Sequence, residues 1–207
     1  MMEDIYKTIE GTAEGLYKEK GSKFIALAYP VKTEEQIKEI LQQLRKEFYD
    51  ARHHCYAWRI DARNERTRSN DDGEPSGSAG KPILNQIFSY ELYDILVVVI
   101  RYFGGTKLGI SGLINAYKTA TREALENATI IKKEIRDLYQ IEFEYPIMNK
   151  VMRVIKEDGL VIKKQDFDSR CIIKLEIRLS TINKSTNRLS KILGVKLKKL
   201  SGNNLSV

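Results

Sequence analysis

The feature that most limits the possible folds is the run ILVVVI, residues 95–100, which is followed at once by the glycine-rich stretch RYFGGTKLGISG, residues 101–112. Six consecutive apolar and mostly β-branched residues predict a strand that is buried on both faces. The run is far shorter than the roughly 20 apolar residues that a membrane span requires. The chain must therefore place a covered strand directly before a glycine loop.

The sequence around this strand predicts a first domain that mixes strands and helices. Further strands are expected at residues 22–31 and 54–60, where β-branched and aromatic residues gather. Thr33 is placed to cap a helix, with Gln36 three positions on. A second helix is expected at residues 112–128, which contain helix formers throughout. Between the strand that ends near residue 60 and the buried run, the sequence predicts a long polar loop.

The pattern changes from about residue 134. Its alternation predicts strand, helix, strand, strand, helix and strand, and Gly159 and Gly194 stand where the two helices should end. This order is typical of the ferredoxin-like plan, an antiparallel sheet with both helices on one face. The fold class is thus expected to be α+β.

Two domains follow from this change of pattern, residues 1–131 and 132–207, joined by a short and stiff connection near residues 131–137. Charge divides in the same place. From residue 131 onward there are 17 Lys+Arg against 9 Asp+Glu, a net charge of +8, whereas the preceding part has 18 against 19, a net charge of −1. A basic domain raises the prospect of an RNA, ribosome or other polyanion partner.

The composition, 42% apolar and 30% charged, is that of an ordinary globular protein. The beginning of the sequence, MMEDIYKTIEG, contains acidic residues and no apolar segment typical of a signal peptide, so we expect a cytoplasmic protein without membrane association. The two cysteines, Cys55 and Cys171, are expected to be buried thiols. A catalytic pair of Cys55 with His53 is the alternative, since the two share a strand face, but no acidic third group is evident.

The glycine loop is the first candidate site. A strand ends, glycines follow and a helix begins, and backbone NH groups in this geometry attract anions. Arg101 and Lys107 would add charge beside Gly104, Gly105 and Gly109. The spacing matches neither the P-loop nor the dinucleotide-binding pattern, and a tight turn that needs glycine for steric reasons is an equal alternative.

The polar loop is the second candidate. It contains the stretch DDGEPSGS, which consists of Asp71, Asp72, Gly73, Glu74, Pro75, Ser76, Gly77 and Ser78. Three carboxylates could bind Mg²⁺. They could equally form Asx turns and cap a helix that begins near Pro82. A third interpretation pairs them with Arg63, Arg66 or Lys81 across loops.

Basic residues near the end of the chain form a third candidate, a surface for RNA or ribosome contact. These residues are Lys184, Arg188, Lys191, Lys196 and Lys198. The first three recur at helical spacing and share a face. A merely solvated face is the alternative, and no aromatic pair accompanies these residues to indicate base stacking.

Together the segments KGSKFIA, ARHHCYAW, DDGEPSGSAGKPIL, VVVIRYFGGTKLG and SGLINAY resemble the YigZ/IMPACT family, in its bacterial two-domain YigZ type. The match runs from about Tyr6 to Ala128, and the remainder resembles the smaller domain of bacterial members. Ser78 stands where Thr is usual in the family, and Ser111 where Gly is usual.

The resemblance implies a first domain similar to certain ribosomal proteins and to the fourth domain of elongation factor G, with a left-handed βαβ crossover. It implies a second domain similar to the ferredoxin-like fifth domain of that factor. Eukaryotic IMPACT proteins regulate translation by binding a partner of the kinase that controls initiation. Nucleic-acid or ribosome binding is the usual inference for bacterial members.

The resulting hypothesis is a non-catalytic protein that binds RNA or the ribosome, or a protein partner in translation, and that needs no cofactor. Its anion site would comprise Arg101, Gly104, Gly105, Lys107, Gly109, Lys81 and His53. The alternative is a Mg²⁺-dependent enzyme for a phosphorylated or nucleotide substrate, with Asp71, Asp72 and Glu74 as metal ligands.

Overall fold

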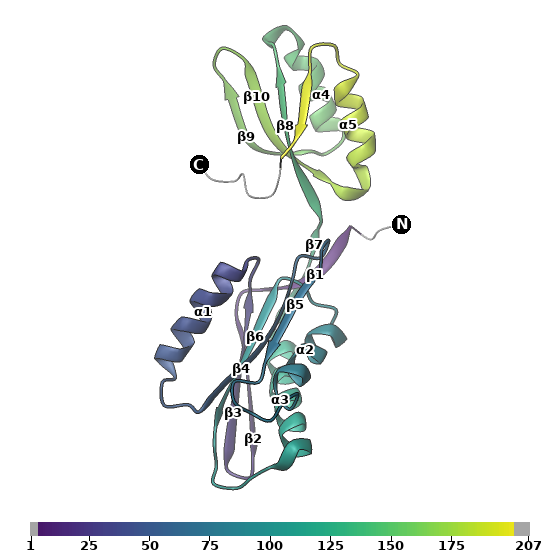
Figure 1. Ribbon diagram of the computed structural model, residues 1–207. Helices are drawn as coiled ribbons and strands as arrows, with labels where there is room; N and C mark the ends of the chain where they lie inside the picture. The colour runs from purple at the N-terminus through teal and green to yellow at the C-terminus, as the bar shows by residue number, and fades with distance from the viewer. Residues whose placement is uncertain (1–3, 201–207) are drawn as a thin grey trace. The chain divides into compact units, whose positions relative to one another are not determined.

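The computed structural model describes residues 4–200, so the outer ends of both expected domains lie outside the described residues. The chain forms two compact units, which are described separately (Figure 1). One is Tyr6–Lys133, and the described part of the other consists of residues 4–5 and 134–200. Both units mix helices with strands, as the sequence predicts. Among residues 4–200, no helix is long and apolar enough to cross a membrane.

The first unit contains a five-stranded sheet whose neighbouring strands are all antiparallel. In spatial order its strands are β2 (Ala13–Glu19), β3 (Ser22–Pro30), β6 (Ile95–Tyr102), β4 (His53–Ile60) and β5 (Arg66–Asn70). The three inner strands are those that the apolar runs predict. The edge strand β5 lies within the segment expected to be a loop.

Helices cover both faces of this sheet (Figure 1). They are α1 (Glu34–Glu47) on one face, and α2 (Gly80–Ser89) and α3 (Gly109–Glu126) on the other. Alternate residues of β6 therefore enter different cores: Val97 and Val99 pack in the cluster with α2 and α3, whereas Val98 packs in the cluster with α1. Burial on both faces explains why the strand sequence is apolar without alternation.

The predicted helix start at Thr33 is confirmed, because the backbone NH of Gln36 donates to the Thr33 hydroxyl at 3.3 Å. Strands β1 (Ile5–Glu10) and β7 (Thr129–Glu134) pair with each other in a sheet of two strands. The chain passes between the units both at residues 5–6 and at residues 133–134. The sequence pattern indicated a connection near residues 131–137 and gave no sign of the passage at residues 5–6.

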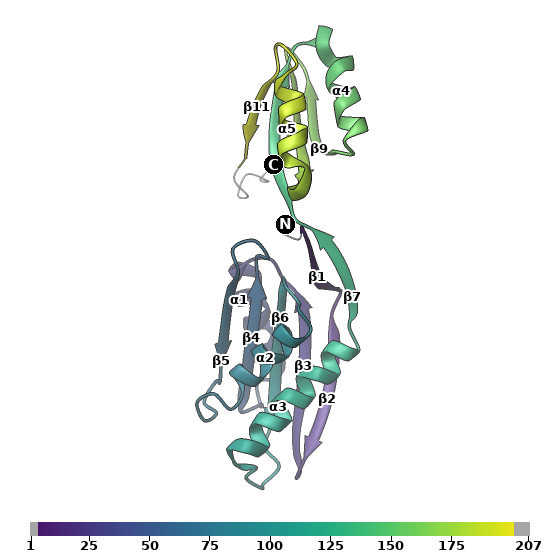
Figure 2. The ribbon, with the colours of Figure 1, turned by 90° about the vertical axis from the view of Figure 1, so that its right-hand side faces the viewer.

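The second unit is an antiparallel sheet with the strand order β11-β8-β10-β9. In chain order its elements are β8 (Arg136–Phe143), η1 (Tyr145–Ile147), α4 (Met148–Glu157), β9 (Val161–Phe167), β10 (Cys171–Arg178), η2 (Leu179–Thr181), α5 (Ile182–Ser190) and β11 (Lys196–Lys199). Both α4 and α5 lie on one face of the sheet (Figure 2). Every second residue of β10 is buried beneath them, so the sheet has one covered face and one face open to water.

Candidate functional site

The acidic loop between β5 and α2 begins with a carboxylate that caps a helix. One oxygen of Asp71 accepts hydrogen bonds from the backbone NH groups of Ala79 (3.0 Å) and Gly80 (2.8 Å), and the other accepts from that of Gly77 (2.9 Å). The NH groups of Ala79 and Gly80 are orphan donors at the start of α2, and a negative charge there is stabilising. The capping interpretation of Asp71 is thus confirmed, although α2 begins at Gly80 rather than near Pro82.

Asp72, the next residue, contacts α1 and β4 rather than α2. Its carboxylate accepts from the backbone NH of His54 at 2.7 Å and from the Arg45 guanidinium at 2.8 Å. Burial alone would raise the pKa of Asp72, but these two hydrogen bonds outweigh it, and the pKa lies below its ordinary value. Asp72 adopts a left-handed φ of 42°, a conformation that Asp tolerates better than most residues.

Glu74 forms a buried ion pair with Arg101. The Arg101 Nη1 donates to Glu74 Oε1 at 2.5 Å, and the two side chains are only 7% and 4% exposed. The Tyr117 hydroxyl donates to the same oxygen at 2.9 Å. The charge of Arg101 is therefore already balanced within the protein, so Arg101 does not supply a free cation beside the glycine loop.

The three carboxylates face different partners, and this arrangement does not favour a magnesium site. Asp71 binds backbone NH groups, Asp72 binds Arg45, and Glu74 binds Arg101. Among residues 4–200, no three His, Cys, Asp or Glu side chains are grouped as metal ligands.

The ion-pair partners of the acidic loop differ from those expected, which were Arg63, Arg66 or Lys81. Asp72 pairs with Arg45 and Glu74 pairs with Arg101. Arg66 pairs instead with Glu34.

Behind Glu74, the Cys55 thiol joins the same network. Its Sγ lies 3.3 Å from the Tyr117 hydroxyl and 3.0 Å from the backbone oxygen of Asp71. Cys55 is fully buried, and burial raises the pKa of its thiol, as it raises the pKa of the Tyr117 hydroxyl. A thiol with a raised pKa is a poor nucleophile, so the alternative of a catalytic Cys55–His53 pair is not supported.

The glycine loop between β6 and α3 is shaped by close packing and by backbone conformation. A Cβ on Gly104 would lie 1.9 Å from the backbone carbon of Gly21, and the Gly104 NH donates to the Ser22 hydroxyl at 3.1 Å. Gly105 has a φ of 86°, which disfavours residues with a side chain. The steric interpretation of these glycines is therefore well founded, and Gly104 serves to dock the loop on the β2–β3 turn.

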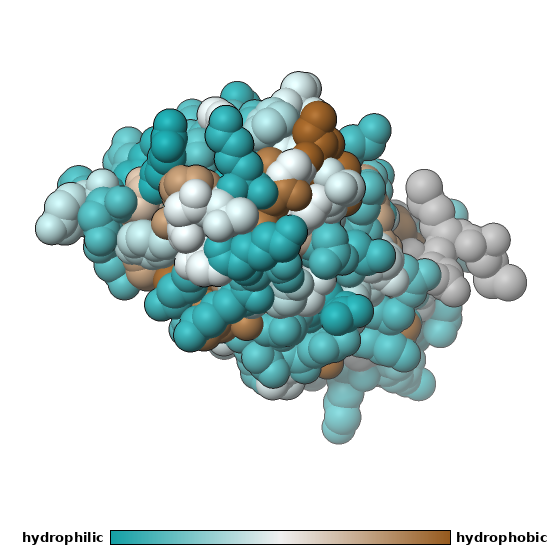
Figure 3. Space-filling view, turned by 90° about the horizontal axis from the view of Figure 1, so that it is seen from below, coloured by the Kyte–Doolittle hydropathy of each residue, from teal (hydrophilic) through white to brown (hydrophobic). Residues whose placement is uncertain are grey.

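A cleft of about 460 Å³ opens between the glycine loop and the acidic loop. We call it the α3 cleft, and its lining consists of Arg52, His53, Glu74, Pro75, Arg101, Phe103, Lys107, Leu108, Gly109, Ile110 and Leu113. The glycine loop and the β2–β3 turn lie together at one end of the first unit in Figures 1 and 2. Figure 3 views that end, where apolar residues gather among hydrophilic ones.

The His53 ring is fixed at the base of this cleft. Its Nδ1 lies 2.8 Å from the backbone oxygen of Asp72, which can only accept, so Nδ1 carries the proton. The other ring nitrogen, Nε2, lies 3.9 Å from Glu74 Oε1. At the rim, Lys107 and Arg52 are exposed, and neither forms an ion pair with another of the described residues. The α3 cleft thus combines free cations, apolar walls and a polar base.

The structure brings only part of the predicted anion site together. His53, Arg101, Lys107 and Gly109 line the α3 cleft, as do Glu74 and Pro75 of the acidic loop. Lys81 lines a separate hollow of about 400 Å³ with Gly77. Ser78 is buried, and its hydroxyl donates to the Pro75 oxygen at 2.6 Å, a hydrogen bond that a Thr hydroxyl would keep.

Sequence reasoning missed Arg52, Ile110, Leu113 and Tyr117 as members of the site. Arg52 directly precedes His53, so its charge near the motif was a usable signal. The others belong to one helix whose apolar residues look like ordinary core positions. Ile110 and Leu113 line the cleft because they lie near the start of α3, beside the glycine loop, and this position is known only from the structure.

The predicted basic surface of the second unit is partly neutralised. Lys184 lies 3.5 Å from Asp158, and Arg188 pairs with both Asp158 and Glu157 at the end of α4. Lys191, Lys196 and Lys198 are exposed. The helical face expected to meet a polyanion is thus in part an ion-pair network between α4 and α5.

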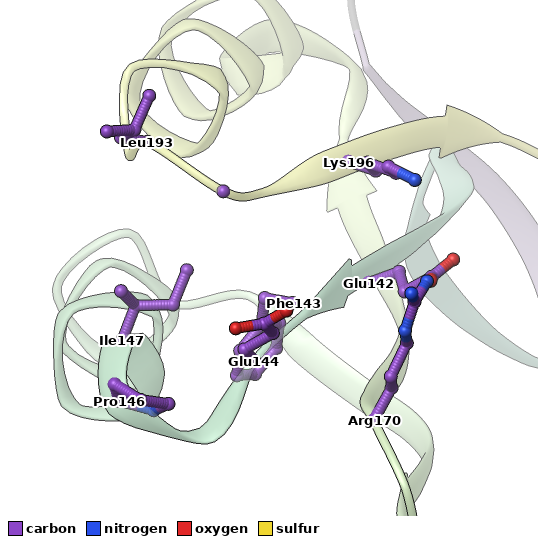
Figure 4. A pocket seen from close by; sticks show the side chains of 9 residues that line it. Glu142, Phe143, Glu144, Pro146, Ile147, Arg170, Leu193 and Lys196 are labelled. Carbon is purple, nitrogen blue, oxygen red and sulfur yellow. The ribbon is translucent and has the colours of Figure 1, made fainter.

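A second large hollow, of about 440 Å³, lies in this unit (Figure 4). Two of its four charged lining residues are already paired, since Arg170 donates to Glu142 at 2.6 Å. Leu193, Ile147 and Pro146 line its other side. No lining residue has a buried polar atom that lacks a partner among the described residues. This hollow is therefore a weaker candidate than the α3 cleft.

Comparison with known proteins matches residues 20–125 to the Impact N-terminal domain. The chain is 31% identical to the IMPACT family member YigZ of Escherichia coli (strain K12) over 174 residues, which is 83% of this chain and 85% of that protein. It is 34% identical to the IMPACT homolog of Saccharomyces cerevisiae over 56% of this chain and 46% of that protein. A crystal structure of a hypothetical protein matches with a TM-score of 0.73 and 26% identity, covering 97% of this chain and all of that one.

Proposed function

The chain belongs to the IMPACT family, and on that premise we propose that it is a non-catalytic binding protein of the translation machinery, which attaches to RNA or the ribosome through the α3 cleft. The observation that carries the proposal is the pair of free cations, Lys107 and Arg52, on the rim of a cleft with a polar base. Exposed cations that have no protein partner are available to neutralise phosphates.

The partners of the three acidic side chains are the reason to propose binding rather than metal-dependent catalysis. Asp71, Asp72 and Glu74 are each neutralised or hydrogen-bonded within the protein, and the raised pKa of Cys55 leaves the cleft without an activated thiol. The family resemblance supplies the link to translation, since eukaryotic IMPACT proteins are regulators of that process. A protein partner from the same machinery would be compatible with this role.

We assign the two units to the domains expected from the resemblance. The antiparallel order β11-β8-β10-β9 supports a ferredoxin-like second domain from residue 132 onward, similar to the fifth domain of elongation factor G. The succession β3, α1, β4 supports a first domain similar to the fourth domain of that factor, and the left-handed crossover stays a prediction. The second domain would extend the binding surface through Lys191, Lys196 and Lys198, in a cytoplasmic protein.

Cosedimentation of the intact protein with purified ribosomes at low and raised salt tests this proposal. We expect binding at low salt that weakens as salt rises. Binding releases counterions from the RNA, and this release is less favourable when the salt concentration is high. Lys107→Ala should reduce the bound fraction. Lys46→Ala, an exposed lysine on α1 at the other face of the sheet, is the matched control and should not. Absence of binding to ribosomes and RNA at low salt, or binding that salt does not affect, would overturn the proposal.

A further inference from the structure

We propose that the α3 cleft takes up one unpaired nucleotide of an RNA chain, with its base against Phe103, its edge at the base of the cleft and its phosphate at Lys107. This inference rests on the proposed function and names the form of RNA that the site would recognise. Four features of the cleft point to such a ligand: its size, its apolar wall, its polar base and its rim.

The size of the cleft suits a single nucleotide. Its volume of about 460 Å³ lies within the range of roughly 300–1,000 Å³ that is usual for small-ligand sites. A double helix presents a continuous backbone and stacked bases, and has no single group to insert into a cleft of this size. An unpaired base, by contrast, can be turned out of the chain and held between protein side chains.

One wall of the cleft is apolar and accessible to solvent. Phe103 is 46% exposed and Ile110 is 61% exposed, and the two residues line the same cleft. The Arg101 guanidinium lies 5.6 Å from the centre of the Phe103 ring, a distance at which a cation stabilises an aromatic ring. An exposed aromatic ring beside free cations is the arrangement on which bases of single strands stack.

Two polar side chains that line the cleft, Arg101 and His53, are candidates to hydrogen-bond a base. Arg101 Nε is buried and has no hydrogen-bond partner among the described residues. Nδ1 of His53 is engaged with the Asp72 oxygen, so Nε2 is the ring nitrogen available to a ligand.

Arg101 and His53 lie on either side of one Glu74 oxygen. Glu74 Oε1 is 2.5 Å from Arg101 Nη1 and 3.9 Å from His53 Nε2. The edge of every base carries donors and acceptors, so a base can satisfy a site of this kind. An unpaired buried donor is costly unless a ligand supplies its partner.

The test compares binding of a short single-stranded RNA and of the duplex of the same sequence by the intact protein. Fluorescence anisotropy of a labelled strand gives both affinities. We expect the single strand to bind at least tenfold more tightly than the duplex. Phe103→Ala should weaken single-strand binding roughly tenfold and leave duplex binding unchanged, whereas Phe103→Leu, which keeps an apolar side chain without the aromatic ring, should be intermediate.

Tyr49→Ala is the matched control, since Tyr49 is an aromatic residue with 82% exposure that does not line the cleft. It should bind as the unaltered protein does. A single strand containing 2-aminopurine gives a second readout, since its fluorescence should change when the base leaves its stacked neighbours for the cleft, and this change should be smaller with Phe103→Ala.

Equal affinity for single strand and duplex, or a Phe103→Ala variant with unaltered binding, would overturn this inference and leave the proposed function standing. Loss of RNA binding in Tyr49→Ala as well would also overturn it, because the effect would not be specific to the cleft. Failure of the intact protein to bind either RNA would overturn the inference, and ribosome binding that persisted without RNA binding would assign the cleft to a protein partner.

Discussion

Arg101 illustrates how one side chain changes what a site can offer. The sequence places it beside a glycine loop as a free cation, but the structure buries it against Glu74. Its role is therefore to hold the acidic loop on the end of the sheet. The free charge at the cleft comes instead from Lys107 and Arg52.

The buried Arg101–Glu74 pair leads to a stability prediction. Arg101→Met should lower the free energy of unfolding of the first unit by about 3–5 kcal/mol, because it leaves a buried carboxylate without its cation. Fluorescence of Trp58 during urea unfolding measures this, since Trp58 is the single tryptophan of the chain and is buried in that unit.

The exposed pair of Arg66 with Glu34 provides the control, and Arg66→Ala should cost at most about 1 kcal/mol. Equal effects of the two substitutions would contradict the view that Arg101 is a structural cation.

Asp72 leads to a prediction about pH. Its pKa in the folded protein lies below the ordinary value of 3.8, so its stabilising effect is complete above that value and is lost as pH falls through the folded-state pKa. Asp72→Asn should therefore be less stable than the unaltered protein near pH 7, and the difference should shrink as pH falls below about 4. Urea unfolding monitored by Trp58 at several pH values measures this difference. A constant difference across the whole range would show that the charge of Asp72 is not responsible.

Much of the site could be predicted from individual residues, but their partners could not. His53, Arg101 and Lys107 were expected to act together in one anion site, and they line one cleft. The partners of Asp72 and Glu74 were predicted wrongly, because Arg45 and Arg101 lie 27 positions away from them along the chain in each case. Sequence spacing carries no information on contacts between a loop and elements that are distant in the chain.

At the scale of structural elements, two glycines of the glycine loop are required for different physical reasons. Gly104 is required by close approach to the backbone of Gly21, whereas Gly105 has open space around it and a left-handed φ. Gly104→Ala should cost about 3 kcal/mol through forced displacement of the loop. Gly105→Ala should cost about 1 kcal/mol through strain alone.

Urea unfolding of the two variants ranks these costs directly. Ribosome binding is expected to fall further in Gly104→Ala, because this displacement would also move Lys107. The reverse order of stability would mean that packing on the β2–β3 turn does not fix the loop.

The elements predicted best are those with a strong apolar signal. Strand β6 and the capped helix α1 were found from sequence because burial on two faces and side-chain capping leave clear patterns. The edge strand β5 was missed, since its sequence RTRSN is exposed and polar and its place in the sheet depends on pairing with β4. Tertiary pairing, rather than local preference, makes this segment a strand.

At the scale of the whole molecule, charge and fold divide at nearly the same place. The chain has a net charge of −1 before residue 131 and +8 after it. Within the basic part, Lys184 and Arg188 pair with acidic residues of α4, so the total charge overstates what a polyanion would meet. The cations expected to matter most are therefore those without partners, above all Lys107 at the α3 cleft.

The most direct test of this account is the dependence of RNA affinity on salt for the intact protein and for Lys107→Ala. The logarithm of the association constant should fall linearly with the logarithm of salt concentration. Lys107→Ala should reduce the slope by about 1, because the variant would neutralise one phosphate fewer, and Lys46→Ala should leave the slope unchanged. A slope that Lys107→Ala does not alter would contradict the central claim that the α3 cleft binds the RNA backbone.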